Sequence, residues 1–487
     1  MICVPITAIT MESALQEMQQ AEKVADILEL RIDYMADPDL PKILAARKIP
    51  VIVTNRKTEE GGKFPGTESE RLQILEKAVR LGPEYIDLEW SCGPQVLQSF
   101  KDMAKDQAAG TRIICSWHNF HKTPSNLKEL YAAIKSAGAD IIKIVTQADS
   151  INDNLQIFDL ICQAQSDNQD IIALCMGPHG EVSRILSPLL GAYLTFGSLR
   201  QGKESAPGQI EARVLRDIYR LGDLEETDFH LYGLVGNPVN QSQGFRLHNS
   251  AFKHQKLSNL YVNFLVEDVS SFVHDFKGYI CGLSVTMPHK QEIIKYLHQI
   301  DPMARRIGAV NTIVKKKGAL IGYNTDTMGA IQAIEAVTPI AGKKVILLGA
   351  GGVARAIGYG IVERGGELTI LNRTFKKAQA LARELCCVAG ELEEIQNIQG
   401  DLLINGTSIG MSPDVDEMPV TESVLRPGLV VFDTIYRPAQ TRLLKEAGER
   451  GCVTISGLDM FIRQAAAQFT LWTGLEAPIE VMRAALI

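Results

Sequence analysis

The chain has 487 residues, of which 46% are hydrophobic, and a formal net charge of -7 at pH 7. This length exceeds one ordinary hydrophobic core and predicts two or three domains. The acidic balance, without a basic tail or stripe, argues against a nucleic-acid partner. The start MICVPITAIT lacks the pattern of a secretory signal, and the most apolar stretch, around 345–362, contains an arginine and five glycines. We therefore expect a cytoplasmic protein without a membrane partner.

The nine cysteines are scattered, odd in number and without a C-x-x-C pair. This pattern favours buried reduced thiols over a disulfide framework or a zinc site. No cluster of other metal-ligating residues stands out, so no metal is expected.

Eight short β-branched runs occur up to about residue 200, and helix-periodic stretches separate them. In chain order the runs are CVPITAI, ILELRID, IPVIVTN, YIDLEW, RIICSWH, DIIKIVT, IIALCMG and AYLTFGS. Strands that alternate with helices pair in parallel, and eight such units in roughly 220 residues match a closed barrel. Residues 1–222 are therefore predicted to form an α/β domain of the (β/α)8 TIM-barrel type. Its active site should lie where the strands end.

Lys143 lies in the sixth of these runs, with isoleucine on both sides. Loss of hydration in an apolar strand favours the neutral amine, which can attack a carbonyl to form a Schiff base. An ion pair with a carboxylate is the common alternative for a single lysine. His118 ends the preceding strand, and Glu60 in the EEGG loop could orient it as a base beside the imine, so we favour the catalytic interpretation.

Arg31, Arg56 and Arg184 lie at the same predicted mouth of the barrel. A guanidinium binds a carboxylate in bidentate fashion, so three of them predict an anionic carbonyl substrate. Salt bridges to nearby carboxylates are an open alternative for any single arginine.

The motifs ELRID, RKTEEGG, SWHNF, MGPHG and SAPGQ occur in this order over essentially all of residues 1–215. Together with the strand lysine they resemble type I 3-dehydroquinate dehydratase. The resemblance implies that Lys143 forms an imine with the substrate ketone, that His118 abstracts the α-proton and assists loss of the hydroxyl, and that Glu60 supports His118. It further implies these substrate-binding residues: Glu29, Arg31, Arg56, Arg184, Ser205 and Gln209, with Arg184 as the carboxylate clamp.

A charged segment without strand pattern, RDIYRLGDLEETD at about 215–228, is interpreted as a helix and a linker. The strand HLYGLVGNPV follows it and opens a region of mixed strands and helices, and KKVILLGAGG opens a nucleotide-binding pattern near 343. We expect a substrate domain over 229–330, completed by C-terminal helices over 459–487, and a Rossmann domain over 331–458.

The segment VILLGAGGVARAIG places two glycines and an alanine at G-x-G-x-x-A spacing between a strand and a helix. Such glycines let the backbone approach a pyrophosphate, whose charge the helix N-terminus attracts. After the next strand the chain has arginine where an NAD enzyme usually has an acidic residue, and arginine suits a 2′-phosphate, although it could also be an ordinary surface residue. We therefore predict NADP as the cofactor, bound by Gly349, Ala350, Gly351, Gly352, Val353, Ala354, Asn372, Arg373 and Thr374.

Lys290 in SVTMPHK and Asp326 in GYNTD are candidates for a catalytic pair in hydride transfer to a ketone. The motifs GNPVNQS, SVTMPHK, IGAVNT, GYNTD, GAGGVARA, NRT, NGTSIGM, DTIYRP and RQAA follow the order of shikimate dehydrogenase, which residues 230–487 resemble. The resemblance implies catalysis by Lys290 and Asp326. It implies substrate contacts from Ser242, Thr286, Asn311, Tyr436 and Gln464.

One position departs from this resemblance. The family pattern S-x-S-P places two hydroxyls on the substrate carboxylate, whereas Ser242-Gln243-Gly244-Phe245 keeps only the first. A lost hydrogen bond to a charged group costs about 1.5 to 3 kcal/mol, or roughly ten- to a hundredfold in binding. Gly244 also leaves space for one more hydroxyl, so oxidation of quinate, or of both quinate and shikimate, is a second hypothesis.

The two resemblances together predict a bifunctional enzyme in which the dehydratase product, 3-dehydroshikimate, is the dehydrogenase substrate. Two other interpretations stay open. The second half could be a binding module with weak or no catalysis, and the first half could be a barrel aldolase that also uses a lysine imine.

Overall fold

The computed structural model describes residues 1–105, 110–224 and 229–486. The chain divides into two compact units. One comprises Met1–Leu231, Asn237–Asn240 and Ser258–Gly278, and the other comprises Tyr232–Gly236, Gln241–Leu257 and Tyr279–Ile487. The end of the predicted linker, 225–228, lies outside the described residues.

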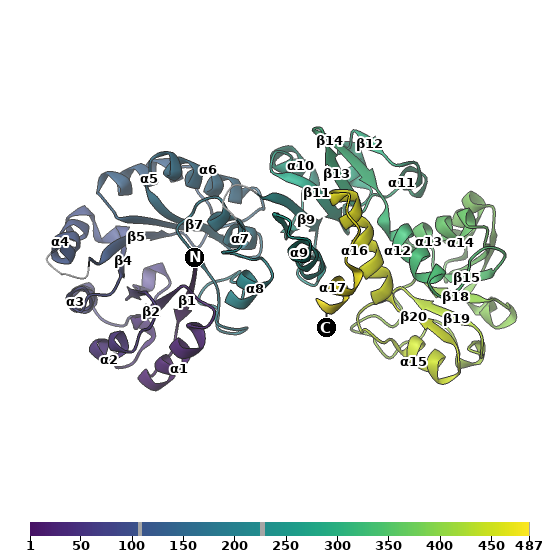
Figure 1. Ribbon diagram of the computed structural model, residues 1–487, viewed down its shortest axis with the longest axis horizontal. Coiled ribbons are helices and arrows are strands. Elements are labelled where there is room, and N and C mark those ends of the chain that lie inside the picture. Colours follow the sequence, from purple (N-terminus) through teal and green to yellow (C-terminus); the bar gives the residue numbers. More distant parts are fainter. Residues whose placement is uncertain (106–109, 225–228, 487) are drawn as a thin grey trace. The chain divides into compact units, whose positions relative to one another are not determined.

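The first half forms an eight-stranded sheet in the order β7-β6-β5-β4-β3-β2-β1-β8 (Figure 1). Its strands are β1 (Ile2–Ile6), β2 (Ile27–Arg31), β3 (Val51–Thr54), β4 (Tyr85–Glu89), β5 (Arg112–His118), β6 (Ile141–Gln147), β7 (Asp170–Met176) and β8 (Thr195–Phe196). Its helices are α1 (Met11–Ala21), α2 (Leu40–Ala45), α3 (Glu68–Arg80), α4 (Pro94–Lys105), α5 (Leu127–Ser136), α6 (Asp153–Ser166), α7 (Glu181–Leu189) and α8 (Ala212–Asp217). Tyr193, just before β8, donates its backbone N–H to Ile171 O of β7 at 2.7 Å, which nearly closes the ring. The predicted (β/α)8 barrel is confirmed.

Side chains alternate between the two faces of each barrel strand. On β2, Ile27 belongs to the apolar core, whereas Glu29 and Arg31 line a cavity at the end of the strand. On β6, Ile141 belongs to the same core and Lys143 to the cavity. The interior therefore has an apolar base and a charged mouth, which is the distribution that a barrel enzyme requires.

A second sheet has the order β10-β9-β11-β13-β14-β12 and is mixed, because β13 is antiparallel to both β11 and β14. Its strands are β9 (His230–Gly236), β10 (Asn259–Leu265), β11 (Ile280–Val285), β12 (Gln299–Ile300), β13 (Thr312–Lys316) and β14 (Ala319–Tyr323). The helices of this region are α9 (Gly244–His254), α10 (Val269–Phe276), α11 (Pro302–Ile307) and α12 (Thr325–Glu335).

The third sheet is parallel throughout and has the order β17-β16-β15-β18-β19-β20. Its strands are β15 (Lys344–Leu348), β16 (Glu367–Leu371), β17 (Val388–Gly390), β18 (Leu402–Asn405), β19 (Val430–Asp433) and β20 (Val453–Ile455). Its helices are α13 (Gly352–Glu363), α14 (Phe375–Leu385) and α15 (Arg442–Glu449), and α16 (Gly457–Thr473) and α17 (Ile479–Ala484) end the chain. Strand order reverses at β15, and dinucleotides bind at such a switch point in doubly wound sheets. The predicted Rossmann fold is confirmed.

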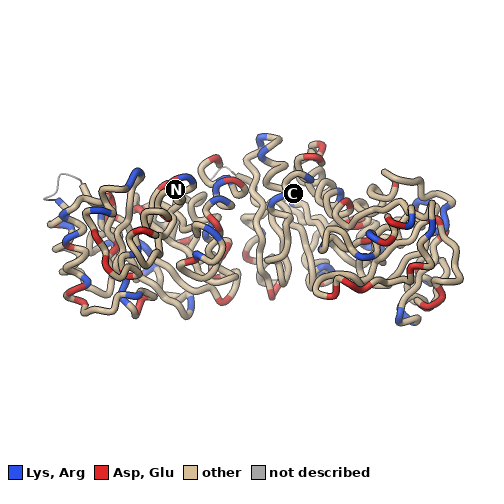
Figure 2. Tube along the Cα trace, turned by 90° about the horizontal axis from the view of Figure 1, so that it is seen from below, with Lys and Arg blue, Asp and Glu red and all other residues tan. Residues whose placement is uncertain are grey.

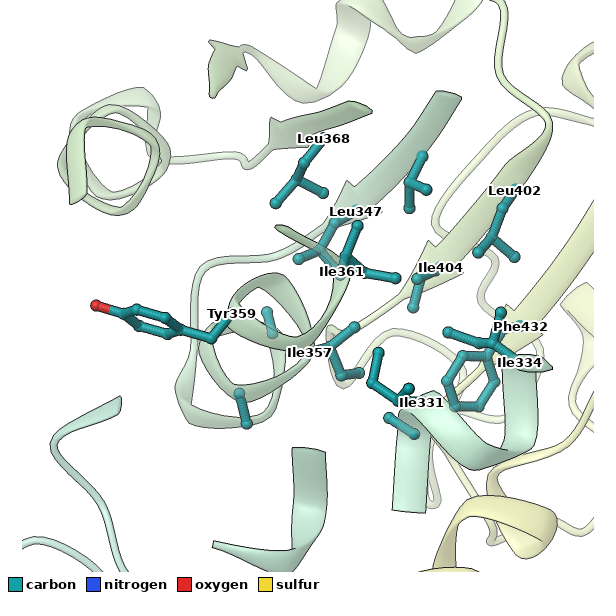
Figure 3. Packing of buried hydrophobic residues seen from close by; sticks show 14 of the residues in the cluster. Ile331, Ile334, Leu347, Ile357, Tyr359, Ile361, Leu368, Leu402, Ile404 and Phe432 are labelled. Atoms are coloured by element: carbon teal, nitrogen blue, oxygen red, sulfur yellow. The ribbon is translucent and has the colours of Figure 1, made fainter. Parts of the chain in front are cut away.

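Both faces of this parallel sheet are buried. Leu347 of β15, Ile404 of β18 and Phe432 of β19 pack with Ile357 of α13 and Ile331 of α12 (Figure 3). Neighbouring residues of the same strands belong to a separate core on the other face, which α15 helps to cover. Burial on both faces explains why these strands read as continuous apolar runs in the sequence.

Lysine and arginine are interspersed with aspartate and glutamate over the described chain (Figure 2). Within the described residues, every helix is too short or too polar to cross a membrane. All nine cysteines are free thiols.

Candidate active sites

A cavity lies at the carboxyl ends of the barrel strands. It brings together all nine site residues predicted in the first half: Glu29, Arg31, Arg56, Glu60, His118, Lys143, Arg184, Ser205 and Gln209. Apolar side chains complete its wall: Phe120, Val145, Leu174, Met176 and Phe196. The cavity therefore combines charged groups with a surface that excludes water.

Lys143 is buried, and its Nζ donates to Asp87 Oδ2 at 2.9 Å. The same nitrogen lies 3.5 Å from Glu29 Oε1 and 4.6 Å from the centre of the Phe196 ring. The isoleucines next to Lys143 in sequence do not surround its amine, because adjacent strand residues point to opposite faces. The expectation of an apolar environment was therefore wrong. The lysine has two carboxylates and one aromatic ring as neighbours.

Asp87 is a residue of this site that the sequence reasoning missed. Its Oδ1 accepts hydrogen bonds from Arg56 Nη2 at 2.8 Å and Ser116 Oγ at 2.6 Å. Burial alone would raise the pKa of Asp87, but the charges of Arg56 and Lys143 outweigh it and hold the pKa well below its usual range. A signal was available, because Asp87 and Glu89 alternate along β4 and both must face the barrel interior.

His118 lies with Nδ1 3.1 Å from Glu60 Oε2. Burial, together with the positive charges of Arg56 and Lys143, holds the pKa of His118 well below its ordinary value. The imidazole is therefore neutral at pH 7, and an Nδ1–H donated to Glu60 leaves Nε2 as a proton acceptor. Ser91 Oγ, which donates to Glu60 at 2.8 Å, fixes this carboxylate in turn.

Two of the three arginines are paired with carboxylates of the protein. Arg31 forms a bidentate contact with Asp33 at 2.9 and 2.7 Å. Arg56 lies 2.8 Å from Asp87 and 3.2 Å from Glu89. The salt-bridge alternative thus describes both of these arginines.

Arg184 differs from the other two, because no carboxylate among the described residues lies within salt-bridge distance of it. It is buried, its Nη2 donates to Pro207 O at 2.9 Å, and its Nε has no partner among the described residues. Burial lowers the pKa of Arg184 to about 10, so it stays charged at pH 7. Glu181 of the same helix attracts this charge from beyond salt-bridge distance. A buried cation with no carboxylate in direct contact is suited to bind an anionic ligand.

The loop between β8 and α8 carries Ser205 and Gln209. The backbone N–H of Ser205 donates to Gln209 Oε1 at 2.8 Å, and Gln209 Nε2 donates to Ser205 Oγ at 3.0 Å. Gly208 has a φ of +76°, and a Cβ there would lie 2.6 Å from Gly177 O. Only glycine allows this close approach, which places both polar side chains in the cavity wall.

A second cluster forms in the other half of the chain around Asp326, in the first turn of α12. Lys290 Nζ donates to Asp326 Oδ2 at 2.6 Å, and Asn311 Nδ2 donates to Asp326 Oδ1 at 2.8 Å. The Asn311 side-chain carbonyl accepts from the Thr325 N–H and from Thr312 Oγ1, both at 2.8 Å. The structure thus joins three of the predicted residues into one hydrogen-bonded group.

Helix α16 supports this cluster with one face. Gln464, Gln468 and Trp472 follow each other at intervals of four residues and so project from the same side. Gln464 Nε2 donates to Thr325 Oγ1 at 3.1 Å, and Trp472 Nε1 donates to Ile313 O at 2.9 Å.

Gln468, which the sequence reasoning also missed, lies between them and is buried. Its Nε2 donates to Thr312 Oγ1 at 3.0 Å, and its Oε1 accepts from Ser284 Oγ at 2.9 Å. Burial lowers the pKa of the neighbouring His248 to about 3. The repeat Q-x-x-x-Q-x-x-x-W was the available signal for this polar face.

The remaining predicted substrate contacts lie on loops and a helix start. Ser242 Oγ accepts from the Gly244 N–H at 3.2 Å, where α9 begins. Thr286 follows β11, and a Cβ on Gly236 would lie 2.2 Å from its methyl group. Tyr436 follows β19, is 38% exposed and stacks on Phe461. Among the described residues, the side chains of these three form no hydrogen bond with the Lys290 cluster.

The predicted nucleotide residues lie at the end of β15 and the start of α13. Gly349 has a φ of +104°, which favours glycine, and a Cβ there would lie 2.9 Å from Gly406 O. A Cβ on Gly351 or Gly352 would meet nothing within 4 Å, so open space borders the helix N-terminus. Ala354 is buried against the core. This cradle fits a pyrophosphate.

Three further predicted residues follow β16. Asn372 Nδ2 donates to Thr374 O at 3.0 Å, and Arg373 between them is exposed. Ala350 and Val353 are partly buried and pack against the core below the turn. The exposed arginine fits a phosphate on the adenosine ribose.

Family models match four parts of the chain. The type I 3-dehydroquinase model matches residues 2–226, and the shikimate dehydrogenase substrate binding domain matches 234–313. The shikimate/quinate 5-dehydrogenase model matches 332–419, and the shikimate 5′-dehydrogenase C-terminal domain matches 457–487.

Curated relatives and solved structures agree with these matches. The chain is 38% identical over 508 residues to the chloroplastic bifunctional 3-dehydroquinate dehydratase/shikimate dehydrogenase of Arabidopsis thaliana, covering 99% of this chain and 83% of the relative. It is 42% identical over 269 residues to the shikimate dehydrogenase (NADP(+)) of Bacillus cereus strain B4264, covering 53% of this chain and 97% of the relative. The structure of shikimate 5-dehydrogenase from Thermus thermophilus with NADP(H) and shikimate matches with a TM-score of 0.50 and 32% identity, over 53% of this chain and 98% of that one.

Proposed function

The chain belongs to the family of bifunctional 3-dehydroquinate dehydratases/shikimate dehydrogenases, and we propose how its residues divide the two reactions. The first half is a lyase that dehydrates 3-dehydroquinate, and the second half is an NADP-dependent oxidoreductase that interconverts 3-dehydroshikimate and shikimate. We assign dehydration to the barrel cavity and reduction to the cluster around Lys290. The observation that carries the assignment is one cavity that holds a buried lysine, a neutral histidine and an unpaired arginine.

In the barrel, Lys143 Nζ attacks the ketone carbon of 3-dehydroquinate, and the carbonyl oxygen leaves as water to give an iminium. His118 Nε2 then removes the α-proton, and the electron pair moves toward the iminium nitrogen. The protonated His118 returns this proton to the leaving hydroxyl, which departs as a second water. Hydrolysis of the imine releases 3-dehydroshikimate and restores the amine.

The other cavity residues bind the substrate or orient the catalytic side chains. Glu60 holds His118 in the tautomer that leaves Nε2 free. Arg184 is assigned to the substrate carboxylate, because it is the cavity arginine with no carboxylate partner among the described residues. Glu29, Arg31 and Arg56 shape the charged wall, and the pair Ser205 and Gln209 covers the bound substrate.

In the second half, Lys290 is assigned to transfer a proton to the carbonyl oxygen of 3-dehydroshikimate. Asp326 positions the Lys290 ammonium, and Asn311 fixes Asp326. Ser242, Thr286, Tyr436 and Gln464 are assigned to substrate binding. NADPH supplies the hydride when bound.

NADP is assigned to the glycine turn after β15 and to Asn372, Arg373 and Thr374. An arginine at this position favours the 2′-phosphate of NADP over the free hydroxyl of NAD. We propose domain boundaries of 1–222, of 229–330 with 459–487, and of 331–458. We further propose a cytoplasmic location and no nucleic-acid or membrane partner.

A second candidate activity is oxidation of quinate by the dehydrogenase half. Gly244 has no side chain, and its N–H donates to Ser242 Oγ, the one hydroxyl that the motif retains. Space in place of a second hydroxyl would admit the extra hydroxyl of quinate. The turnover rates with quinate and with shikimate, each measured with saturating NADP, show which of these two substrates the dehydrogenase half oxidises. Negligible quinate oxidation would remove this candidate.

The assignment is tested by supplying 3-dehydroquinate and NADPH and recording 3-dehydroshikimate absorbance and NADPH loss together. Wild type should consume both. The Lys143→Ala chain should leave both untouched, and the Lys290→Ala chain should accumulate 3-dehydroshikimate. A wild-type chain that stalls at 3-dehydroshikimate would contradict the assignment of the second half.

A further inference from the structure

Asp87 occupies a defined place beside the reacting nitrogen of the barrel. Its carboxylate is buried, and Oδ2 accepts from Lys143 Nζ at 2.9 Å. The other oxygen, Oδ1, is held by Arg56 and by Ser116 at 2.8 and 2.6 Å. With two donors on Oδ1 the carboxylate cannot rotate, so Oδ2 stays directed at Nζ.

The nearby carboxylates are less well placed for this nitrogen. Glu29 Oε1 lies 3.5 Å from Lys143 Nζ and already accepts a hydrogen bond from Thr54 Oγ1 at 2.9 Å. Glu60 faces His118 and Ser91 instead. Asp87 is thus the nearest carboxylate to Nζ among the described residues.

Lys143 faces charged or titratable groups from several barrel strands. They are Cys3 of β1, Glu29 of β2, Arg56 after β3, Asp87 of β4 and His118 of β5, with the Phe196 ring of β8 beside them. Asp87 and Glu29 are the carboxylates within 4 Å of Nζ in the described part of the chain.

We propose that Asp87 is the counter-ion of Lys143 through the reaction and keeps the imine in its protonated form. This inference rests on the proposed Schiff-base function of the barrel. The nitrogen is positive as the resting ammonium and as the iminium, and it is neutral only as the attacking amine or as a deprotonated imine. A carboxylate at 2.9 Å favours the positive forms.

The chemical consequence concerns the proton-abstraction step. When His118 removes the α-proton, the electron pair of the broken C–H bond must move toward the nitrogen. A protonated iminium accepts this pair by becoming a neutral enamine, whereas a neutral imine would have to become an anion. Asp87 therefore holds the electron sink in its active form and takes no proton itself.

The test uses the full chain, 3-dehydroshikimate as the ketone, and sodium cyanoborohydride, which reduces a protonated imine but not a neutral one. Mass spectrometry then measures the fraction of chains with a reduced adduct. The wild-type yield should change little between pH 6 and pH 8. In Asp87→Asn the yield at pH 8 should fall at least about tenfold and recover toward pH 6, because an opposite charge at this distance shifts a protonation equilibrium by roughly 1 to 3 pH units.

Steady-state kinetics give a second readout. In Asp87→Asn the kcat for dehydration should fall by about tenfold or more, while KM changes little, because Arg184 is untouched. Asp33→Asn is a matched control, since it removes a buried carboxylate that pairs with Arg31 and not with Lys143. Its adduct yield should follow that of wild type at every pH.

Equal adduct yields in Asp87→Asn and wild type at each pH would overturn the proposal. If circular dichroism finds Asp87→Asn unfolded, Asp87→Glu decides, because it keeps a carboxylate at this position. Retained trapping at pH 8 supports the counter-ion role of Asp87, and a tenfold loss in a folded Asp87→Glu chain overturns it. The Lys143→Ala variant distinguishes a failure of the counter-ion proposal from a failure of the Schiff-base function. A wild-type adduct that persists in Lys143→Ala, or no wild-type adduct at all, would refute the Schiff-base function itself.

Discussion

The two halves of the chain each place a lysine against a carboxylate, but in different surroundings. The Lys143 side chain is 5% exposed and faces both Asp87 and Glu29. The Lys290 side chain is 27% exposed and pairs with Asp326. A nucleophile that forms a covalent bond benefits from a fixed position with little water, whereas a proton donor must regain its proton from solvent. The difference in exposure therefore matches the difference in the proposed chemistry.

The largest expected effect follows from a substitution of Lys143. Replacing it with alanine removes the nucleophile, so dehydration should fall on the order of 10⁴-fold or more. Reduction of added 3-dehydroshikimate should persist at the wild-type rate, because the second cluster is unchanged. Dehydration and NADPH oxidation measured separately on one preparation check this. Parallel loss of both activities would contradict independent sites.

The reciprocal change, Lys290→Ala, removes a proton donor and not a covalent partner. Reduction should fall by about 10²- to 10⁴-fold, the usual contribution of general acid–base catalysis, while dehydration stays intact. Initial rates with 3-dehydroshikimate and NADPH measure the effect. A Lys290→Ala enzyme that reduces 3-dehydroshikimate normally would move the proton-donor role elsewhere.

Matched substitutions of two barrel arginines, Arg184 and Arg31, test which of them binds the substrate carboxylate. Arg184→Met should raise KM for 3-dehydroquinate by roughly ten- to a hundredfold, because it removes the unpaired cation assigned to the substrate carboxylate. Arg31→Met is the matched variant, since Asp33 already pairs with Arg31. Its effect on KM should be smaller, and the opposite order would refute the assignment of Arg184.

On the dehydrogenase side, Gly244→Ser restores a hydroxyl beside Ser242. A gained hydrogen bond to the substrate carboxylate should lower KM for shikimate by up to about tenfold. If spare room at Gly244 admits quinate, the same change should reduce any quinate oxidation. Unchanged KM values for both substrates would remove Gly244 from the determinants of specificity.

The smallest effect concerns the buried His248. Burial lowers the pKa of His248 to about 3, whereas an unfolded histidine has a pKa of about 6.5. Below pH 6.5 the unfolded chain binds a proton that the folded chain does not, so stability is lost as the pH falls toward 3, by about 1.4 kcal/mol per pH unit.

The His248→Asn variant has no titratable side chain at this position, so its unfolded chain does not bind this proton. The difference in unfolding free energy between wild type and variant should therefore shrink between pH 7 and pH 5 in urea titrations. Dehydration should be unaffected in His248→Asn, unlike in His118→Ala. A stability difference that does not change with pH would contradict a neutral buried His248.

The architecture of both halves could be predicted because it depends on local periodicity. Eight β-branched runs gave the barrel, and the glycine spacing after β15 gave the Rossmann turn. The residues of the barrel cavity could also be named, since parallel strands end at one mouth. Here Lys143 within β6, His118 at the end of β5 and Glu60 after β3 come together in one cavity.

Partners across the barrel could not be predicted from local sequence. Asp87 reaches Lys143 from a strand that is not its neighbour in the sheet, and Arg56 turned out to be committed to Asp87 and Glu89. Gln468 likewise acts through hydrogen bonds to β13 and β11, which lie far from it in the sequence. The sequence pattern indicates that Asp87 and Gln468 lie on polar faces, but the residues that each of them contacts depend on tertiary packing.

The most direct test of the contrast between the two lysines is peptide mapping of the wild-type chain after reduction with borohydride in the presence of 3-dehydroshikimate. We expect a reduced adduct on Lys143 and an unmodified Lys290. An adduct on Lys290, or an unmodified Lys143, would contradict the assignment of Schiff-base chemistry to Lys143.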